Sequence, residues 1–351
     1  MSPIYLFFLS SGLFLGWSLG ANDVSNIFGA AVGSKMLKFK TAAVIASIFI
    51  ILGAVFGGAA TTETLTKLGE VNAVAGAFMV ALSAGLSVYF MARTGLTTST
   101  SQAIVGSIIA WNIYVGHQTD FSVLTSIMTG WVLCPILAAF LAVVLYFVLK
   151  KAFHLMHLHV LKQYQLIKTG FVFAGAFCTY ALGANNIANV MGVFVKTAPF
   201  EVLRINALTF SPEQVLFFLG AIAISVGIFT YSQKVMATVG KSVMKMSPFI
   251  AFIVVLSEAL VLFLFSSQGL RNTLMTAGIP ALPLVPVSST QAVIGAILGI
   301  GLLKGGKGIN WSITFRIVAG WLTTPLTAML ICFISLFFLE NVFQLPVYFR
   351  Q

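Results

Sequence analysis

The sequence predicts an all-α polytopic membrane protein built from two related halves. Apolar residues make up 59% of the 351 residues and charged residues only 8%, and the mean hydropathy is +1.03. A soluble domain carries roughly 25% charged residues, so this composition does not supply a water-facing surface. Apolar runs of about 20 residues, the length that crosses a bilayer, recur along the whole chain.

Ten apolar segments account for most of the chain. They cover roughly residues 4–30, 41–60, 71–92, 97–115, 121–149, 168–190, 214–232, 247–267, 284–303 and 311–340. The fifth and tenth are too long for one crossing and contain Pro135 and Pro325, which predicts broken helices or re-entrant hairpins. With such hairpins included, we expect about 10–12 membrane segments.

The basic residues predict which side of the membrane each loop faces. With the N-terminus outside and ten alternating crossings, 14 of the 19 Lys and Arg residues fall on the cytoplasmic side, as the positive-inside rule requires. These 14 residues are Lys35, Lys38, Lys40, Arg93, Lys150, Lys151, Lys162, Lys168, Lys234, Lys241, Lys245, Lys304, Lys307 and Arg316. The net charge of +11 then reflects the lipid bilayer and not nucleic acid. The pattern predicts a multi-pass protein of a prokaryotic-type plasma membrane with both termini outside.

Three sequence blocks occur twice in the same order. GANDVSNIFG at residues 20–29 matches GANNIANVMG at 183–192, and STSQAIVG at 99–106 matches SSTQAVIG at 288–295. Gly-Trp followed by Pro135 matches Gly-Trp followed by Pro325. Each half has five segments, an odd number, so the second half enters the membrane from the opposite side. Inverted repeats are typical of secondary transporters, whose binding site lies where the repeats meet.

The repeat divides the chain into three predicted parts. These are a first transmembrane repeat over residues 1–150, a linker over 151–167 and an inverted second repeat over 168–351. The linker region mixes basic and apolar residues at helical spacing, which predicts an amphipathic helix on the cytoplasmic surface. Its three histidines fit an interfacial helix better than a metal site.

Two acidic residues, Asp23 and Glu258, lie within apolar segments. A charge at membrane depth is costly and by default indicates function. Asn22, Ser25 and Asn26 add oxygen atoms around Asp23, which predicts a Na⁺ site at Asp23 and Asn26. A structural, hydrogen-bonded carboxylate is the alternative for Asp23. Glu258 has only a serine beside it, and it fits a cation site and a structural partner equally well.

Two polar blocks occupy matching positions in the halves. They consist of Ser99, Thr100, Ser101 and Gln102, and of Ser288, Ser289, Thr290 and Gln291. A helix that starts at such a block offers free backbone N–H groups and the positive end of its dipole, and the side chains add further donors. Together these groups bind a tetrahedral oxyanion without a fixed positive charge. Ser and Thr residues that merely cap a helix are the alternative, but the repetition favours an anion site.

These blocks resemble the paired signatures of the inorganic phosphate transporter (PiT) family. GANDVSNIFGAAVGSK and GANNIANVMG are similar to the family's GANDVAN segments, and TSTSQAIVGSIIA and VSSTQAVIGAILG to its Ser-Thr-Thr-His-type blocks. YSQKVMATVG at residues 231–240 is similar to the stretch before the family's Glu-bearing helix. The resemblance implies a homodimeric symporter that couples inorganic phosphate to a cation, usually Na⁺. The expected cation-coupling residues are Asn22, Asp23, Asn26, Asn185, Asn186, Asn189 and Glu258.

Two departures from the family pattern keep other substrates open. Asn186 stands where many members have Asp, and Gln102 and Gln291 stand where many have His. An amide in place of a carboxylate adds donors and removes negative charge, which moves the balance towards sulfate. The same replacement removes one candidate ligand for the coupling cation, Na⁺ or H⁺, so the number of coupled ions stays open.

Two other classes of protein fit the sequence less well. A cation exchanger is expected to carry an acid at matching positions of both halves, whereas Asp23 faces Asn186, and Glu258 falls opposite residues 83–85. An enzyme needs a nucleophile with its base or a metal cluster, and the apolar segments contain neither. The prediction is therefore a transporter without a cofactor other than its coupling ion.

Overall fold

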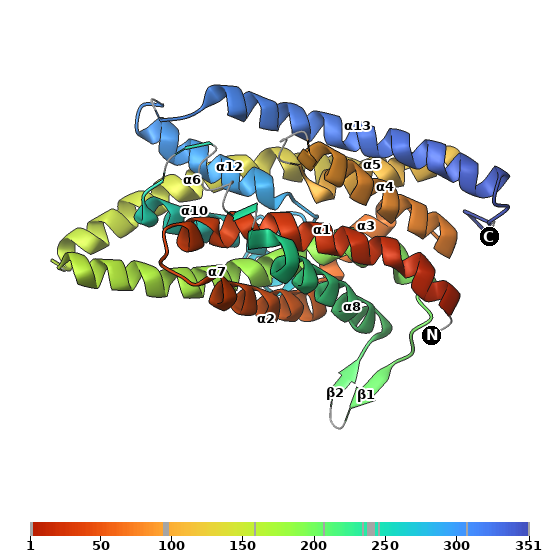
Figure 1. Cartoon of the computed structure of the whole chain (residues 1–351), viewed down its shortest axis with the longest axis horizontal. Coiled ribbons are helices and arrows are strands. Elements are labelled where there is room, and N and C mark those ends of the chain that lie inside the picture. Colours follow the sequence, from red (N-terminus) through yellow and green to blue (C-terminus); the bar gives the residue numbers. More distant parts are fainter. Residues whose placement is uncertain are drawn as a thin grey trace.

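The computed structural model describes residues 3–93, 98–157, 159–205, 208–233, 235–236, 243–244, 246–306 and 308–349. Long helices that run roughly along one axis dominate this part of the chain (Figure 1). Eight of them are long and apolar enough to cross a membrane. The lysines at 234, 241, 245 and 307, Arg350, residues 94–97 and most of the stretch 234–242 lie outside the described residues.

The first half forms six helices within the described residues. They are α1 (Pro3–Gly33), α2 (Phe39–Gly57), α3 (Ala59–Leu68), α4 (Val74–Arg93), α5 (Thr100–Val115) and α6 (Phe121–Leu155). Five of these coincide with the predicted segments. The short helix α3 was not predicted, because its sequence AATTETLTKL is rich in threonine, carries two charged residues and lacks the apolar run of its neighbours.

The second half repeats this plan with additions. Its elements are α7 (Val160–Met191), η1 (Gly192–Thr197), β1 (Leu203–Ile205), β2 (Leu208–Phe210), α8 (Pro212–Gly227), the π-helical η2 (Ile228–Ser232), α10 (Pro248–Ser266), α11 (Gln268–Thr276), α12 (Ser289–Leu303) and α13 (Trp311–Asn341). The strands β1 and β2 pair antiparallel with Arg204 opposite Thr209. All ten predicted segments therefore form helices, and the only sheet among the described residues is this small hairpin, which was not predicted.

The predicted breaks at the two prolines were wrong. α6 continues through Pro135 over 35 residues and α13 continues through Pro325 over 31 residues. A proline removes one helical hydrogen bond, but neighbouring helices in a membrane protein compensate for it. A glycine of another helix packs directly on each proline: Gly295 of α12 on Pro135, and Gly106 of α5 on Pro325.

The prediction of a separate linker helix over residues 151–167 was also wrong. α6 extends to Leu155, a turn follows at His157, and α7 begins at Val160. The basic and apolar residues of this region are thus the ends of two long helices that form a hairpin (Figure 1). Both chain termini lie at one end of the bundle, and the turn between α6 and α7 lies at the other (Figure 1).

The two halves exchange their packing partners. α5 of the first half packs on α13 of the second, and α12 of the second packs on α6 of the first. Likewise α1 packs on α8, and α7 packs on α2. The backbones approach closely at matching glycines, because Gly20 of α1 contacts the backbone of Ile224 and Gly183 of α7 contacts that of Ile50. Matching positions of the repeat therefore make matching contacts.

We predict that these glycine contacts tolerate no side chain. In Gly106→Ala or Gly295→Ala, the new Cβ collides with the carbonyl oxygen of Pro325 or Pro135. Overpacking of this kind costs about 1–3 kcal/mol, so both variants should melt at lower temperature in detergent. The control Gly269→Ala places its Cβ in open space, and it should be neutral or slightly stabilising. Equal melting temperatures for all three variants would contradict the close helix packing.

Candidate functional site

The starts of α5 and α12 meet inside the bundle and are joined by two reciprocal hydrogen bonds. Ser101 Oγ donates to the carbonyl oxygen of Val287 (3.0 Å), and Thr290 Oγ1 donates to that of Thr98 (3.2 Å). Ser101 and Thr290 match in the repeat, as do Thr98 and Val287. All eight residues of the two predicted anion blocks are buried. The structure therefore brings both blocks together, as the repeat predicted.

Both helices begin with a serine cap and leave backbone donors free. Ser99 Oγ accepts from the amide of Gln102, and Ser288 Oγ accepts from that of Gln291, each at 3.3 Å. The capping role proposed as the alternative is thus real for these two serines. It uses the third amide of each helix, so the amides of the first two residues have no acceptor within the helix. Two positive helix ends therefore converge on one region.

Unpaired buried polar atoms collect around these two helix starts. Among the described residues, buried side-chain polar atoms without a hydrogen-bond partner are concentrated in the predicted site residues, which contribute seven of them. Those seven are Gln102 Oε1, Gln291 Oε1, Asn186 Nδ2, Asn189 Oδ1, Ser289 Oγ and both carboxylate oxygens of Glu258. Because buried polar groups are nearly always paired, this concentration indicates a place for a polar ligand.

Asp23 and Glu258 form an acidic pair beside the start of α12. α1 carries Asp23 and α10 carries Glu258, both are buried, and they lie close enough to interact electrostatically. The side chain of Ser289 lies next to both carboxylates, although its hydroxyl makes no hydrogen bond of good geometry. Cys178 lies beside Glu258. Two neighbouring buried carboxylates require protons or bound cations to offset their charge.

The region of the second repeat that corresponds to Asp23 is neutral. It contains Asn186 and Asn189, which together with Ser101 we call the amide cluster. Asn189 Nδ2 donates to Asn186 Oδ1 and to Ser101 Oγ, both at 2.8 Å. Asn186 matches Asp23 in the repeat, and the stretch opposite Glu258 contains Ser83, which is buried. The two sides of the site therefore differ in charge: one carries the acidic pair and the other carries amides.

The remaining predicted residues have different surroundings. Asn185 is buried and uses both ends of its amide on the extended segment before α12, donating to Val285 O (3.3 Å) and accepting from Val287 N (3.0 Å). Its contacts hold that segment in place. Asn22 and Asn26 are partly exposed, and Asn22 Nδ2 donates to Ser18 O of its own helix (3.2 Å).

The sequence did not single out two threonines of α3 that support the site. Thr64 Oγ1 donates to Leu284 O (2.6 Å), in the segment that leads into α12. Thr61 Oγ1 donates to Ala184 O (3.0 Å), next to the second Gly-Ala-Asn motif. The threonine-rich stretch AATTETLTKL, directly after two glycines in an apolar region, was the available signal.

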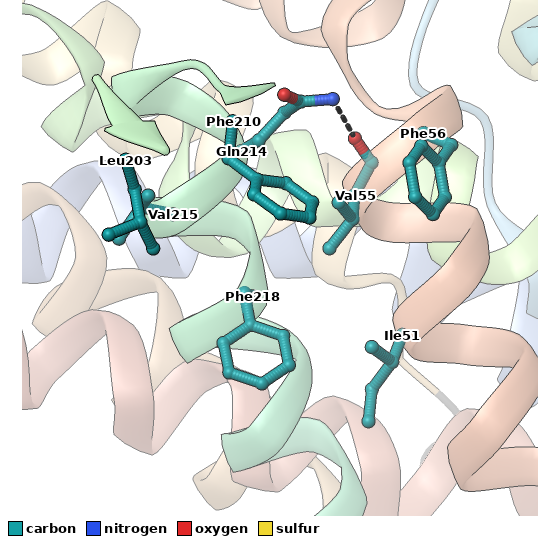
Figure 2. A pocket seen from close by; sticks show the side chains of 8 residues that line it. All are labelled: Ile51, Val55, Phe56, Leu203, Phe210, Gln214, Val215 and Phe218. Atoms are coloured by element: carbon teal, nitrogen blue, oxygen red, sulfur yellow. Dashed lines mark hydrogen bonds between the residues drawn. The ribbon is translucent and has the colours of Figure 1, made fainter. Parts of the chain in front are cut away.

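A separate apolar pocket of about 290 Å³ lies between α2, α8 and the hairpin (Figure 2). It is lined by Ile51, Val55, Phe56, Leu203, Phe210, Gln214, Val215 and Phe218. The amide of Gln214 is already used, because it donates to Val55 O (Figure 2). It also accepts from Ser211 N. This pocket therefore does not suit an oxyanion, in contrast to the region between α5 and α12.

Membrane-spanning helices around a buried polar site define the chain as a membrane transporter. Residues 19–332 match the model of the phosphate transporter family, and the chain belongs to that family. The family assignment also makes it a transporter and not an enzyme.

Individual relatives agree with this assignment. A protein of Methanocaldococcus jannaschii named "Putative phosphate permease" is 28% identical over 92% of this chain and 93% of its own length. One of Thermococcus kodakarensis with the same description is 25% identical over 95% of this chain and 97% of its own length. A solved structure titled "The sodium-dependent phosphate transporter" has the same fold, with a TM-score of 0.76 and 20% identity over 97% of this chain and 100% of that chain.

We predict that Asn185 is needed to position α12. Asn185→Ala leaves Val285 O and Val287 N without their side-chain partner, and each unsatisfied buried group costs about 1–3 kcal/mol. The variant should melt at lower temperature and show a higher KM for its substrate. The exposed Asn272 of α11 provides the control, since Asn272→Ala removes no buried contact. Unchanged KM and melting temperature in Asn185→Ala would exclude the anchoring role.

Proposed function

We propose that the chain is a secondary active transporter that carries inorganic phosphate in symport with Na⁺ or H⁺. One observation carries the proposal: two buried helix starts converge, with unpaired polar atoms around them and the acidic pair at their side. The convergence supplies an anion site, and the acidic pair supplies a cation site next to it. The family assignment supports phosphate as the anion.

The anion site binds through dipoles and hydrogen bonds. The free amides of Thr100, Ser101, Ser289 and Thr290 donate to phosphate oxygens, in the way that helix starts hold phosphate elsewhere. Gln102 and Gln291 enter this region with buried side chains. No Lys or Arg of the described chain is among the buried residues, so the described residues supply no buried positive charge to the site.

Unpaired acceptor atoms favour phosphate over sulfate. Phosphate near neutral pH carries a proton and therefore offers an O–H donor, whereas sulfate offers none. Gln102 Oε1, Gln291 Oε1 and Asn189 Oδ1 are buried acceptors without a partner. A bound phosphate O–H satisfies one of them, but a bound sulfate leaves all of them unpaired, which costs binding energy.

The charge difference between the two sides supports the acidic pair as the site of the coupling cation. Asp23 and Glu258 are the buried carboxylates of the described chain, and Ser289 adds a hydroxyl oxygen between them. Asn26 remains a proposed ligand of Na⁺ beside Asp23. Asn22, Asn186 and Asn189 complete the proposed polar lining, while Asn185 acts by holding the segment before α12.

Several features of the assembly remain part of the proposal. They are the inverted topology of the repeats at 1–150 and 168–351, a homodimer, a prokaryotic-type plasma membrane and external termini. The exchanged helix packing supports the repeat, and the common end of both termini in Figure 1 supports their location on one side.

We predict phosphate uptake by the purified protein in liposomes. Labelled phosphate should accumulate faster under an inward Na⁺ gradient, or under an inward H⁺ gradient if the proton is the coupling ion, because the cation offsets the acidic pair. Unlabelled phosphate should abolish the uptake of label, whereas the same concentration of sulfate should compete weakly. Empty liposomes provide the control. Faster uptake of labelled sulfate than of labelled phosphate would make the substrate sulfate.

We predict unequal effects of charge changes at the matching positions Asp23 and Asn186. Asp23→Asn should reduce cation-driven uptake at least about tenfold, since interactions with a charged group contribute about 1.5–3 kcal/mol. Glu258→Gln should have a similar effect. Asn186→Asp makes the opposite change in the amide cluster and should leave the cation dependence in place. The folded state of each variant is checked by its elution profile and melting temperature, and unchanged cation dependence in Asp23→Asn would exclude Asp23 from coupling.

A further inference from the structure

Two lysines from different helices converge on one tyrosine ring near the turn between α6 and α7. The Nζ atom of Lys150 lies 5.5 Å from the centroid of the Tyr146 ring, and that of Lys304 lies 6.0 Å from it. Tyr146 and Lys150 belong to α6, whereas Lys304 directly follows the last residue of α12. Both lysines are exposed. We call Lys150, Lys304 and Tyr146 the lysine pair site.

None of the acidic residues, all of which lie in the described part of the chain, is available to this site. The chain has eight of them. Asp23 and Glu258 are buried, and Glu63 and Glu70 pair with Lys67 and Lys196. Asp120 caps α6, and Glu340 accepts a hydrogen bond from Tyr114 Oη. Glu201 and Glu213 flank the β1–β2 hairpin. Each of these lies away from the end of the bundle where the two lysines meet.

Helix geometry gives the scale of that separation. Asp120 precedes Lys150 by 30 residues on the continuous helix α6, which corresponds to about 45 Å. The β1–β2 hairpin projects from the side of the bundle, away from the turn between α6 and α7 (Figure 1). The positive charge of this end is therefore not balanced by the acidic residues of the protein itself.

The span between Asp120 and Lys150 also gives the membrane depth of the lysine pair. A bilayer is about 40–45 Å thick with its headgroup regions, and α6 covers that length between the two residues. A helix of this length that begins in one headgroup region reaches the opposite headgroup region near Lys150. Two ammonium groups that share one ring repel each other. The quadrupole of the ring attracts them much more weakly than an anion would.

We propose that the lysine pair site binds the phosphate group of an anionic phospholipid. The two ammonium groups donate charge-assisted hydrogen bonds to the phosphate oxygens, one from each side. Phe147 and Val148, exposed on the same turn of α6 at 55% and 56%, offer an apolar surface to the acyl chains. The attraction of basic residues to anionic lipids at this level supports the occupant.

The site joins two helices with different tasks. α12 begins at the anion block with Ser289 and ends at Leu303, directly before Lys304, so a lipid that bridges Lys150 and Lys304 ties the far end of α12 to α6. The glycines Gly305 and Gly306 follow directly with positive φ, and they carry no side chain that could take the place of the lipid. An effect of lipid on transport rests on the proposed function, whereas the binding itself does not.

The test compares lipids by the melting temperature of the purified protein in a neutral detergent. Phosphatidylglycerol should raise the melting temperature by about 2–4 °C, and zwitterionic phosphatidylcholine should not. The double variant Lys150→Gln/Lys304→Gln should lose this rise, and Lys150→Arg/Lys304→Arg should keep it. The matched control Lys151→Gln/Lys162→Gln removes the same charge from exposed residues of α6 and α7 and should also keep the rise.

Further measurements distinguish binding of the lipid from binding of free phosphate at the lysine pair site. Inorganic phosphate should stabilise the wild type and Lys150→Gln/Lys304→Gln equally, through the site between α5 and α12, and should not displace phosphatidylglycerol. Displacement by millimolar phosphate would assign the lysine pair to the free ion and overturn the lipid proposal. The proposal also fails if the control variant loses as much of the lipid effect as the pair variant, or if phosphatidylglycerol has no effect on the wild type.

Discussion

The reciprocal hydrogen bonds between the starts of α5 and α12 are the constraint on which the rest of the structure depends. Backbone groups inside a membrane must find partners within the protein, and irregular segments such as those before these helices expose them. Here each half satisfies the other: Ser101 pairs with Val287 O, and Thr290 pairs with Thr98 O. Neither half completes its helix start alone, so the site exists only where the two halves meet.

Close helix packing holds these starts in position. Glycines let α5 contact the backbone of α13 and α12 contact that of α6, each at a proline. Small residues at such contacts are the usual means of tight helix association in membranes. Because each half packs its short helix on the long helix of the other, a shift of one half changes the surroundings of both anion blocks. The packing therefore links the geometry of the site to the arrangement of the whole bundle.

The sequence was sufficient to predict the helices and the site blocks, since both depend on local composition and on a repeat. Pattern reasoning was wrong at Pro135 and Pro325, because the cost of a proline depends on the neighbouring helix, and no local pattern shows that Gly295 or Gly106 packs there. It missed α3, whose polar threonines serve other segments. It grouped Asn185 with the other asparagines, although its partners lie about a hundred positions away along the chain. The electrostatic interaction between Asp23 and Glu258 likewise depends on tertiary structure.

The unequal charge of the two sides gives the proposed transport its coupling. The proposed anion site has no buried Lys or Arg among the described residues, and the acidic pair lies beside one of its two helix starts. Two carboxylates repel an approaching phosphate, whereas the same carboxylates with a bound cation do not. In the proposed mechanism, binding of the cation therefore raises the affinity for the anion, and by linkage the anion raises the affinity for the cation by the same factor. Because the amide cluster is neutral, the proposed mutual dependence arises at the acidic side, where Ser289 lies next to the proposed cation site and belongs to the proposed anion site.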